Sequence, residues 1–127
     1  MSKMIRYASL YIDDKKESIS FYTQHLDFTV FKNVMFGDYE QWWILKKKEQ
    51  QEISLILIWN EEENPDRSTL ILNTNDCILE YCRLKDNGFR QLSTPLYSTL
   101  GMSFYFYDPA GNKIVVIEER AYNDPQI

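Results

Sequence analysis

The side chains that most often perform catalysis are few in this sequence and lie far apart. His25 is the only histidine and falls near the end of a helix predicted over residues 15–26, where a surface imidazole beside the terminal carbonyls is the simplest interpretation. A Ser-His-Asp or Cys-His arrangement cannot be assembled around it, and the sequence contains no glycine-rich phosphate loop. Glu118 and Glu119 are adjacent on a predicted strand, so their carboxylates point to opposite faces and cannot act together.

The two cysteines do not form a recognisable metal or redox motif. Cys77 and Cys82 lie five residues apart on one predicted helix, so their side chains point roughly 140° from each other and do not easily form a disulfide. The spacing also lacks a CxxC or Cys/His pattern. We expect two reduced, structural thiols in a cytoplasmic protein, because the sequence shows neither a signal peptide nor a membrane-spanning apolar run.

The charge balance argues against nucleic acid as a partner. The formal net charge is -5, whereas nucleic-acid binding depends on Lys and Arg side chains that neutralise phosphates. The only basic run, Lys46-Lys47-Lys48, is most simply a solvated strand end or hairpin. Acidity of this size favours a cationic ligand by long-range attraction, although it does not identify one.

Aromatic residues are more frequent than a small core requires. They make up 15% of the chain, as three Trp, nine Tyr and seven Phe, so we expect some rings to line a surface or cavity. Trp42 and Trp43 are adjacent on a predicted strand, so one ring faces a helix and the other a cleft. Alternation also places Tyr7, Ser9 and Tyr11 on one face. For Tyr105, Tyr107 and the cleft-facing Trp, ligand stacking and core filling both remain open.

The predicted secondary structure follows one order twice. The first half gives a strand at 4–12, a helix at 15–26, and strands at 28–36, 39–47 and 52–59; the second gives a strand at 68–74, a helix at 76–87, and strands at 89–94, 101–107 and 112–119. A polar segment at 60–67 links them. Asp14 and Asp76, 62 positions apart, each precede a helix, which indicates a duplicated βαβββ unit.

Four motifs in this order resemble the vicinal oxygen chelate superfamily, which contains glyoxalase I, extradiol dioxygenases, fosfomycin-resistance enzymes and bleomycin-resistance proteins. The motifs are Ser9-Leu10-Tyr11-Ile12-Asp13-Asp14, Ser20-Phe21-Tyr22 with Leu26-Asp27-Phe28, Leu84-Lys85-Asp86-Asn87-Gly88-Phe89, and Asp108-Pro109-Ala110-Gly111-Asn112. The resemblance implies an α+β fold in which tandem βαβββ repeats form a curled mixed sheet around a cleft. The length of 127 residues predicts a single domain over residues 1–127, with the repeated units at 4–59 and 68–119.

The same resemblance implies where metal ligands of the superfamily would stand. Those positions, normally occupied by His and Glu, fall on Tyr7, Ser54, Thr69 and Val115. A transition-metal site needs imidazole, carboxylate or thiolate donors, so we predict no metal and no other cofactor. A register slip of one residue would offer Glu52 or Glu118 instead.

The leading hypothesis is a metal-free protein, similar in kind to the bleomycin-resistance proteins, that sequesters an aromatic or cationic compound in an aromatic cleft. The predicted ligand-binding residues are Tyr7, Ser9, Tyr11, Trp43, Ser54, Thr69, Tyr105 and Val115. Two alternatives remain open: an enzyme, either a lyase or dioxygenase with displaced ligands or a metal-free isomerase using Tyr or Glu, and a partner-binding domain that has lost the pocket. The resemblance and the aromatic strand faces also predict a homodimer.

Overall fold

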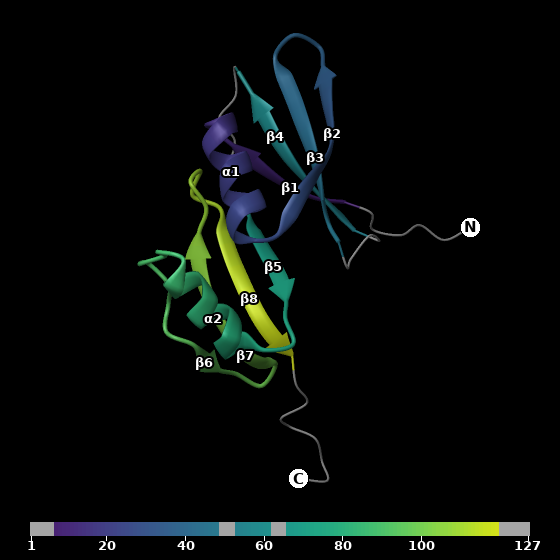
Figure 1. The fold of residues 1–127 in the computed structure, drawn as a ribbon. Helices are drawn as coiled ribbons and strands as arrows, with labels where there is room; N and C mark the ends of the chain where they lie inside the picture. The colour runs from purple at the N-terminus through teal and green to yellow at the C-terminus, as the bar shows by residue number, and fades with distance from the viewer. Residues whose placement is uncertain (1–6, 49–52, 62–65, 120–127) are drawn as a thin grey trace, which may run out of the picture. The chain divides into compact units, whose positions relative to one another are not determined.

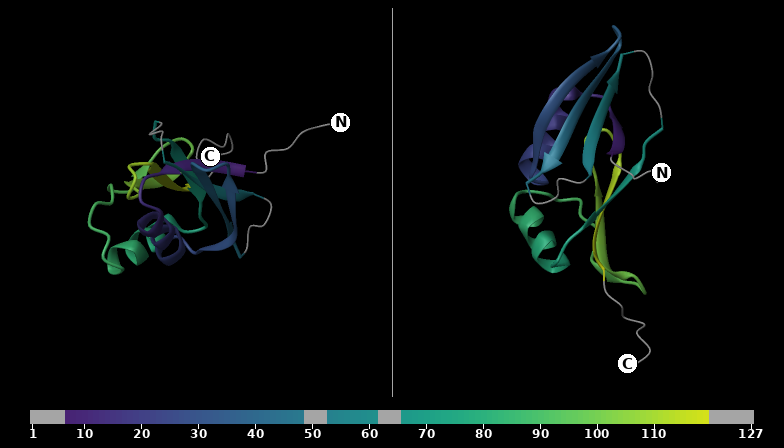
Figure 2. Two further views of the ribbon diagram at one scale, coloured as in Figure 1. Left: turned by 90° about the horizontal axis from the view of Figure 1, so that it is seen from above. Right: turned by 90° about the vertical axis from the view of Figure 1, so that its right-hand side faces the viewer.

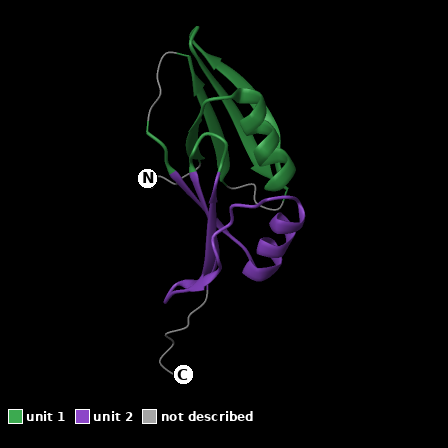
Figure 3. Ribbon diagram, turned by 90° about the vertical axis from the view of Figure 1, so that its left-hand side faces the viewer, with its two compact units in different colours: residues 1–68, 108–112 green, residues 69–107, 113–127 purple. Residues whose placement is uncertain are grey.

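The structure, a computed structural model, describes residues 7–48, 53–61 and 66–119. These residues form two helices and eight strands in two four-stranded sheets (Figure 1). The chain divides into two compact units: unit 1 comprises residues 1–68 and 108–112, and unit 2 comprises residues 69–107 and 113–127 (Figure 3). The α+β fold with repeated βαβββ order is confirmed, whereas the single domain over 1–127 stays a prediction.

Unit 1 contains the first helix and one mixed sheet. Its elements are β1 (Tyr7–Ile12), α1 (Lys15–His25), β2 (Phe28–Phe36), β3 (Glu40–Lys47) and β4 (Ser54–Asn60), and the strand order is β1-β4-β3-β2. Strand β1 is parallel to β4, and the other pairs are antiparallel. Helix α1 begins where predicted because the Asp14 carboxylate accepts a hydrogen bond from the Glu17 amide at 2.9 Å. Residues 4–6 and 52 of the predicted strands lie outside the described residues.

Unit 2 repeats this order. Its elements are β5 (Thr69–Asn73), α2 (Cys77–Asp86), β6 (Leu96–Tyr97), β7 (Gly101–Tyr107) and β8 (Lys113–Glu119), arranged as β5-β8-β7-β6. Strand β5 is parallel to β8, as β1 is to β4. Asp76 caps α2 by accepting a hydrogen bond from the Leu79 amide at 3.0 Å. The two aspartates that mark the sequence repeat therefore perform the same structural role.

Each helix covers one face of its own sheet (Figure 2). The α1 side of unit 1 is buried and apolar, formed by Leu10, Ile12, Phe21, Tyr22, Leu26, Trp43, Leu45, Leu55 and Leu57. The α2 side of unit 2 is formed by Leu70, Cys77, Leu84, Phe104, Phe106, Ile114 and Val116. Burial of these side chains on one face is the main stabilising contribution in each unit. The opposite face of each sheet carries no helix of the described residues.

The strand predicted at 89–94 is wrong. The short strand β6 lies later, at Leu96–Tyr97. In the earlier segment the Phe89 ring meets the Phe106 ring of β7 edge to face, with centres 5.3 Å apart, and the Ser93 amide donates to the Tyr105 carbonyl at 2.9 Å. The Ser93 hydroxyl oxygen in turn accepts from the Tyr105 amide at 2.7 Å. Pro95 has no amide hydrogen to continue a ladder there. Side-chain bonding by Ser93 and the following proline therefore replace regular pairing.

Candidate ligand-binding faces

The uncovered face of the sheet in unit 1 gathers four of the predicted ligand-binding residues. We call it the open face of unit 1, because no helix of the described residues lies on it; it consists of Tyr7, Ser9, Tyr11, Val34, Phe36, Glu40, Trp42, Ile44, Ser54, Ile56 and Ile58. Tyr7 and Phe36 are exposed on this face, whereas Ser54, Ile56 and Ile58 are buried. Tyr7 pairs directly with Ser54, and Tyr11 pairs with Ile58, which pairs in turn with Trp42. Tyr7, Ser9, Tyr11 and Ser54 therefore share one surface, because alternate residues of paired strands point the same way.

The tryptophan on this face is Trp42, not the predicted Trp43. Trp43 is only 8% exposed and stands in the register row with Leu57 and Leu10, which face α1. The ammonium of Lys15, at the start of α1, lies 6.0 Å from the centre of the Trp43 ring. Strand alternation then turns the neighbouring Trp42 to the open face, so Trp42 replaces Trp43 in the candidate site.

Trp42 belongs to a compact group of two rings and one carboxylate. The Phe36 and Trp42 ring centres are 4.3 Å apart, and the Trp42 indole N–H donates to Glu40 Oε2 at 2.8 Å. The other carboxylate oxygen, Oε1, accepts from the Asn60 side-chain amide at 3.0 Å. The two bonds fix the carboxylate beside the rings. This arrangement of ring faces and a negative charge suits a planar or cationic compound.

The open face of unit 2 gathers three further predicted residues. It consists of Thr69, Ile71, Asn73, Ser103, Tyr105, Tyr107, Lys113, Val115 and Ile117. Its register rows run Thr69–Lys113–Tyr107 and Ile71–Val115–Tyr105. Tyr105 and Tyr107 meet edge to face, with ring centres 6.0 Å apart. The structure thus brings Thr69, Tyr105 and Val115 onto one surface, together with Lys113, which sequence reasoning had passed over.

The Asp108–Asn112 turn is a structural clamp within unit 1. The Asp108 carboxylate accepts hydrogen bonds from the Tyr22 hydroxyl at 2.6 Å, the Ala110 amide at 3.0 Å and the Asn112 amide at 2.8 Å. Asp108 is 5% exposed and Tyr22 is fully buried. Burial, followed by the Asp108 charge and its hydrogen bond, raises the pKa of Tyr22 far above its ordinary value. Tyr22 therefore stays protonated and acts as a fixed donor.

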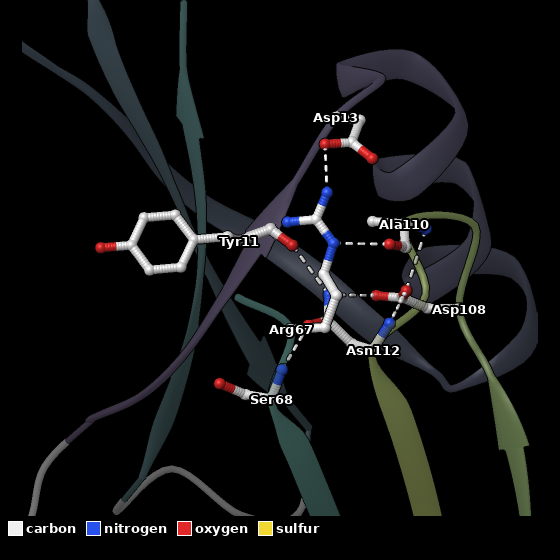
Figure 4. A network of polar contacts seen from close by, with 7 residues as sticks. All are labelled: Tyr11, Asp13, Arg67, Ser68, Asp108, Ala110 and Asn112. Atoms are coloured by element: carbon white, nitrogen blue, oxygen red, sulfur yellow. Dashed lines mark hydrogen bonds and ion pairs between the residues drawn. The ribbon is translucent and has the colours of Figure 1, made fainter. Parts of the chain in front are cut away.

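The same turn holds the backbone of β1 in place (Figure 4). The side-chain amide of Asn112 donates to the Tyr11 carbonyl at 2.8 Å, and its oxygen accepts from the Ser68 amide at 2.9 Å. Arg67 donates to the Ala110 carbonyl at 2.6 Å and forms an ion pair with Asp13. Figure 4 shows the Tyr11 ring pointing away from these contacts. The turn thus positions Tyr11 on the open face without offering a reactive group.

The comparison with known protein families decides the wider relationship. The model of the Glyoxalase/Bleomycin resistance protein/Dioxygenase superfamily matches residues 4–116. The chain belongs to this superfamily. No curated protein matches it at the sequence level.

Solved structures of the superfamily share its fold. An antibiotic-binding protein from Streptomyces sp. CB03234, TnmS3, has 23% identity, a TM-score of 0.79 and coverage of 94% of this chain and 98% of its own. A superfamily member from Sphaerobacter thermophilus has 19% identity and a TM-score of 0.77, and the match covers 93% of this chain and 98% of its own. A glyoxalase I variant from Zea mays has 16% identity and a TM-score of 0.74, and the match covers 93% of this chain and 45% of its own. At these identities the likeness concerns the fold.

The residues at the superfamily's metal positions do not fit a transition metal. Tyr7, Ser54 and Thr69 offer neutral hydroxyls and Val115 offers no donor. Within residues 7–48, 53–61 and 66–119, no group of three or more His, Cys, Asp or Glu side chains is placed to hold an ion. Glu52 lies outside the described residues. The Glu118 carboxylate accepts a hydrogen bond from the Cys77 amide at 2.8 Å.

The histidine and the two cysteines considered in the sequence lie in or beside packed parts of the helices. His25 ends α1 and contacts the edge of Phe21, with ring centres 5.8 Å apart. Cys77 is fully buried, whereas Cys82 is exposed. Burial, with the nearby Glu118 and Asp76 carboxylates, raises the pKa of the Cys77 thiol to about 11. The thiol is thus kept protonated at neutral pH, although a helix N-terminus would by itself favour the thiolate.

Proposed function

We propose that this protein is a metal-free small-molecule-binding protein that sequesters an aromatic or cationic compound. The observation that carries the proposal is the Phe36–Trp42 ring pair beside the fixed Glu40 carboxylate on the open face of unit 1. Stacking on the rings and attraction to the carboxylate act on the same ligand. Planar cations gain from both interactions at once.

Two further observations support binding over catalysis. The Asp108 carboxylate, buried with Tyr22, is occupied by four donors from Tyr22, Ala110 and Asn112, so it serves the fold. The superfamily also includes TnmS3, named as an antibiotic-binding protein, which matches 94% of this chain. Sequestration requires affinity and exposed apolar surface. Exposed side chains of this kind are Tyr7 and Phe36 in unit 1 and Ile71, Tyr105 and Tyr107 in unit 2.

The ligand-binding test uses proflavine, a planar aromatic cation, titrated calorimetrically. We expect Trp42→Ala to weaken binding several-fold, because one good stacking contact contributes roughly 0.5–2 kcal/mol. Glu40→Gln should weaken it as well and should remove much of the salt dependence. Tyr97→Ala is the matched control, since Tyr97 is an exposed ring of unit 2, 69% accessible. Equal affinity in the wild type and Trp42→Ala would contradict the proposed site.

The metal-free part of the proposal has its own measurement. Elemental analysis after dialysis should find no stoichiometric Zn, Ni, Mn or Fe, because hydroxyl and methyl groups replace the superfamily's ligands. About one such metal per chain, in protein without a metal-binding tag, would favour the enzyme alternatives.

Assembly and location complete the proposal. We propose a homodimer, which sedimentation at micromolar concentration tests, and a cytoplasmic location. Among the described residues, no helix is long and apolar enough to cross a membrane.

A further inference from the structure

Lys113 gives the open face of unit 2 a positive charge in an aromatic setting. It begins β8 and stands between Thr69 and Tyr107 in the sheet register. Its side chain is half-buried, and its ammonium lies 4.3 Å from the centre of the Tyr105 ring. This contact holds the ammonium over the face of the sheet.

No described residue forms an ion pair with Lys113. The ion pairs of the described residues include Arg67 with Asp13 and Arg83 with Glu80, and neither of these involves Lys113. No carboxylate of a described residue lies within ion-pair distance of Lys113. Its register neighbours, Thr69 and Tyr107, contribute hydroxyl groups instead. These hydroxyls can donate further hydrogen bonds to a bound anion.

The surface around this ammonium is apolar and accessible. Ile71 is 65% exposed, Tyr107 55% and Tyr105 41%. An aromatic ligand covering these side chains removes apolar area from water, while an acidic substituent reaches the ammonium. An aromatic compound without an acidic group gains only the first contribution.

Comparison of the two units shows that their faces differ in charge. Lys113 in unit 2 and Ser54 in unit 1 each begin the last strand and pair with the first residue of the first strand, Thr69 and Tyr7 respectively. The fixed charge on the open face of unit 1 is instead the carboxylate of Glu40. The two faces therefore favour ligand groups of opposite sign.

We propose that the open face of unit 2 binds aromatic compounds that carry an acidic oxygen group, and that Lys113 recognises this group. The inference rests on the proposed small-molecule-binding function and names a ligand class for the second face. Lys113 selects the ligand through a charge-assisted hydrogen bond, and Tyr105 and Tyr107 contact its ring.

The test compares 2-naphthoate with the neutral 2-naphthamide, which has the same rings. We expect the wild type to bind 2-naphthoate about tenfold more tightly in calorimetric titrations. Lys113→Gln should abolish that preference while 2-naphthamide binding is retained, and Lys113→Arg should preserve it. Amide chemical shifts in ¹H–¹⁵N spectra should change along β5, β7 and β8.

Lys85→Gln is the matched control, because Lys85 also lies over a tyrosine ring, 5.5 Å from the centre of Tyr81, but on α2. It should leave the preference for 2-naphthoate unchanged. Equal binding of both compounds, or an undiminished preference in Lys113→Gln, would overturn the role of Lys113 while the proposed function stands. Failure of proflavine and both naphthalenes to bind would overturn the proposed function and this inference together.

Discussion

Replacing Asp108 with Ala should lower the free energy of unfolding by about 3–5 kcal/mol. The substitution removes the acceptor of the Tyr22 hydroxyl, of two backbone amides and of one N–H of the Asn112 side-chain amide, which keeps its bond to the Tyr11 carbonyl. Buried donors that lose a partner cost about 1–3 kcal/mol each, reduced where the site relaxes. Urea unfolding followed by circular dichroism measures the change.

A matched control compares the buried Asp108 carboxylate with an exposed carboxylate of the same unit. Asp13→Asn removes the ion pair with Arg67, but the Asp13 side chain is 57% exposed, so the expected loss is at most about 1 kcal/mol. Tyr22→Phe should fall between the two, at about 1–2 kcal/mol, because the Asp108 carboxylate keeps its amide donors. Equal effects of Asp108→Ala and Asp13→Asn would show that the buried network is not what stabilises unit 1.

The sequence predicted this turn but not its partners. Pro109 and Gly111 mark a turn from residue chemistry alone. The hydrogen bond from Tyr22, however, joins residues 86 positions apart, and no local sequence pattern predicts a pair at that separation. The sequence predicts only that Arg67 belongs to a polar linker, although its side chain donates to the Ala110 carbonyl at 2.6 Å. Local signals predict turns and caps, whereas these contacts depend on the packed fold.

The candidate site was predictable to a similar extent. Alternation placed Tyr7, Ser9 and Tyr11 on one face, and the structure retains that grouping. Alternation also required Trp42 and Trp43 to face opposite ways, but it could not say which one faces the helix. That choice depends on the register of β3 against β4, which long-range pairing fixes. Lys113 was missed for the same reason, because its neighbours come from β5 and β7.

Replacing Trp43 with Ala should therefore destabilise the protein by about 3–5 kcal/mol, the usual loss for a large buried aromatic side chain. Trp43 is 8% exposed, and it shares its register row with Leu57 and Leu10 on the side that α1 covers. The truncation removes apolar contacts and leaves a cavity that the surrounding side chains fill only in part. Thermal and urea unfolding measure this loss directly.

Trp42→Ala is the matched control, because it removes the same side chain one position away on the opposite face. It should cost at most about 1.5 kcal/mol, since it loses one ring contact and one hydrogen bond at a partly exposed position. The ligand effects should run the other way, because proflavine affinity depends on Trp42. A large stability loss in Trp42→Ala with little change in Trp43→Ala would mean that the sheet faces are assigned in reverse, and that the ligand-binding ring is Trp43.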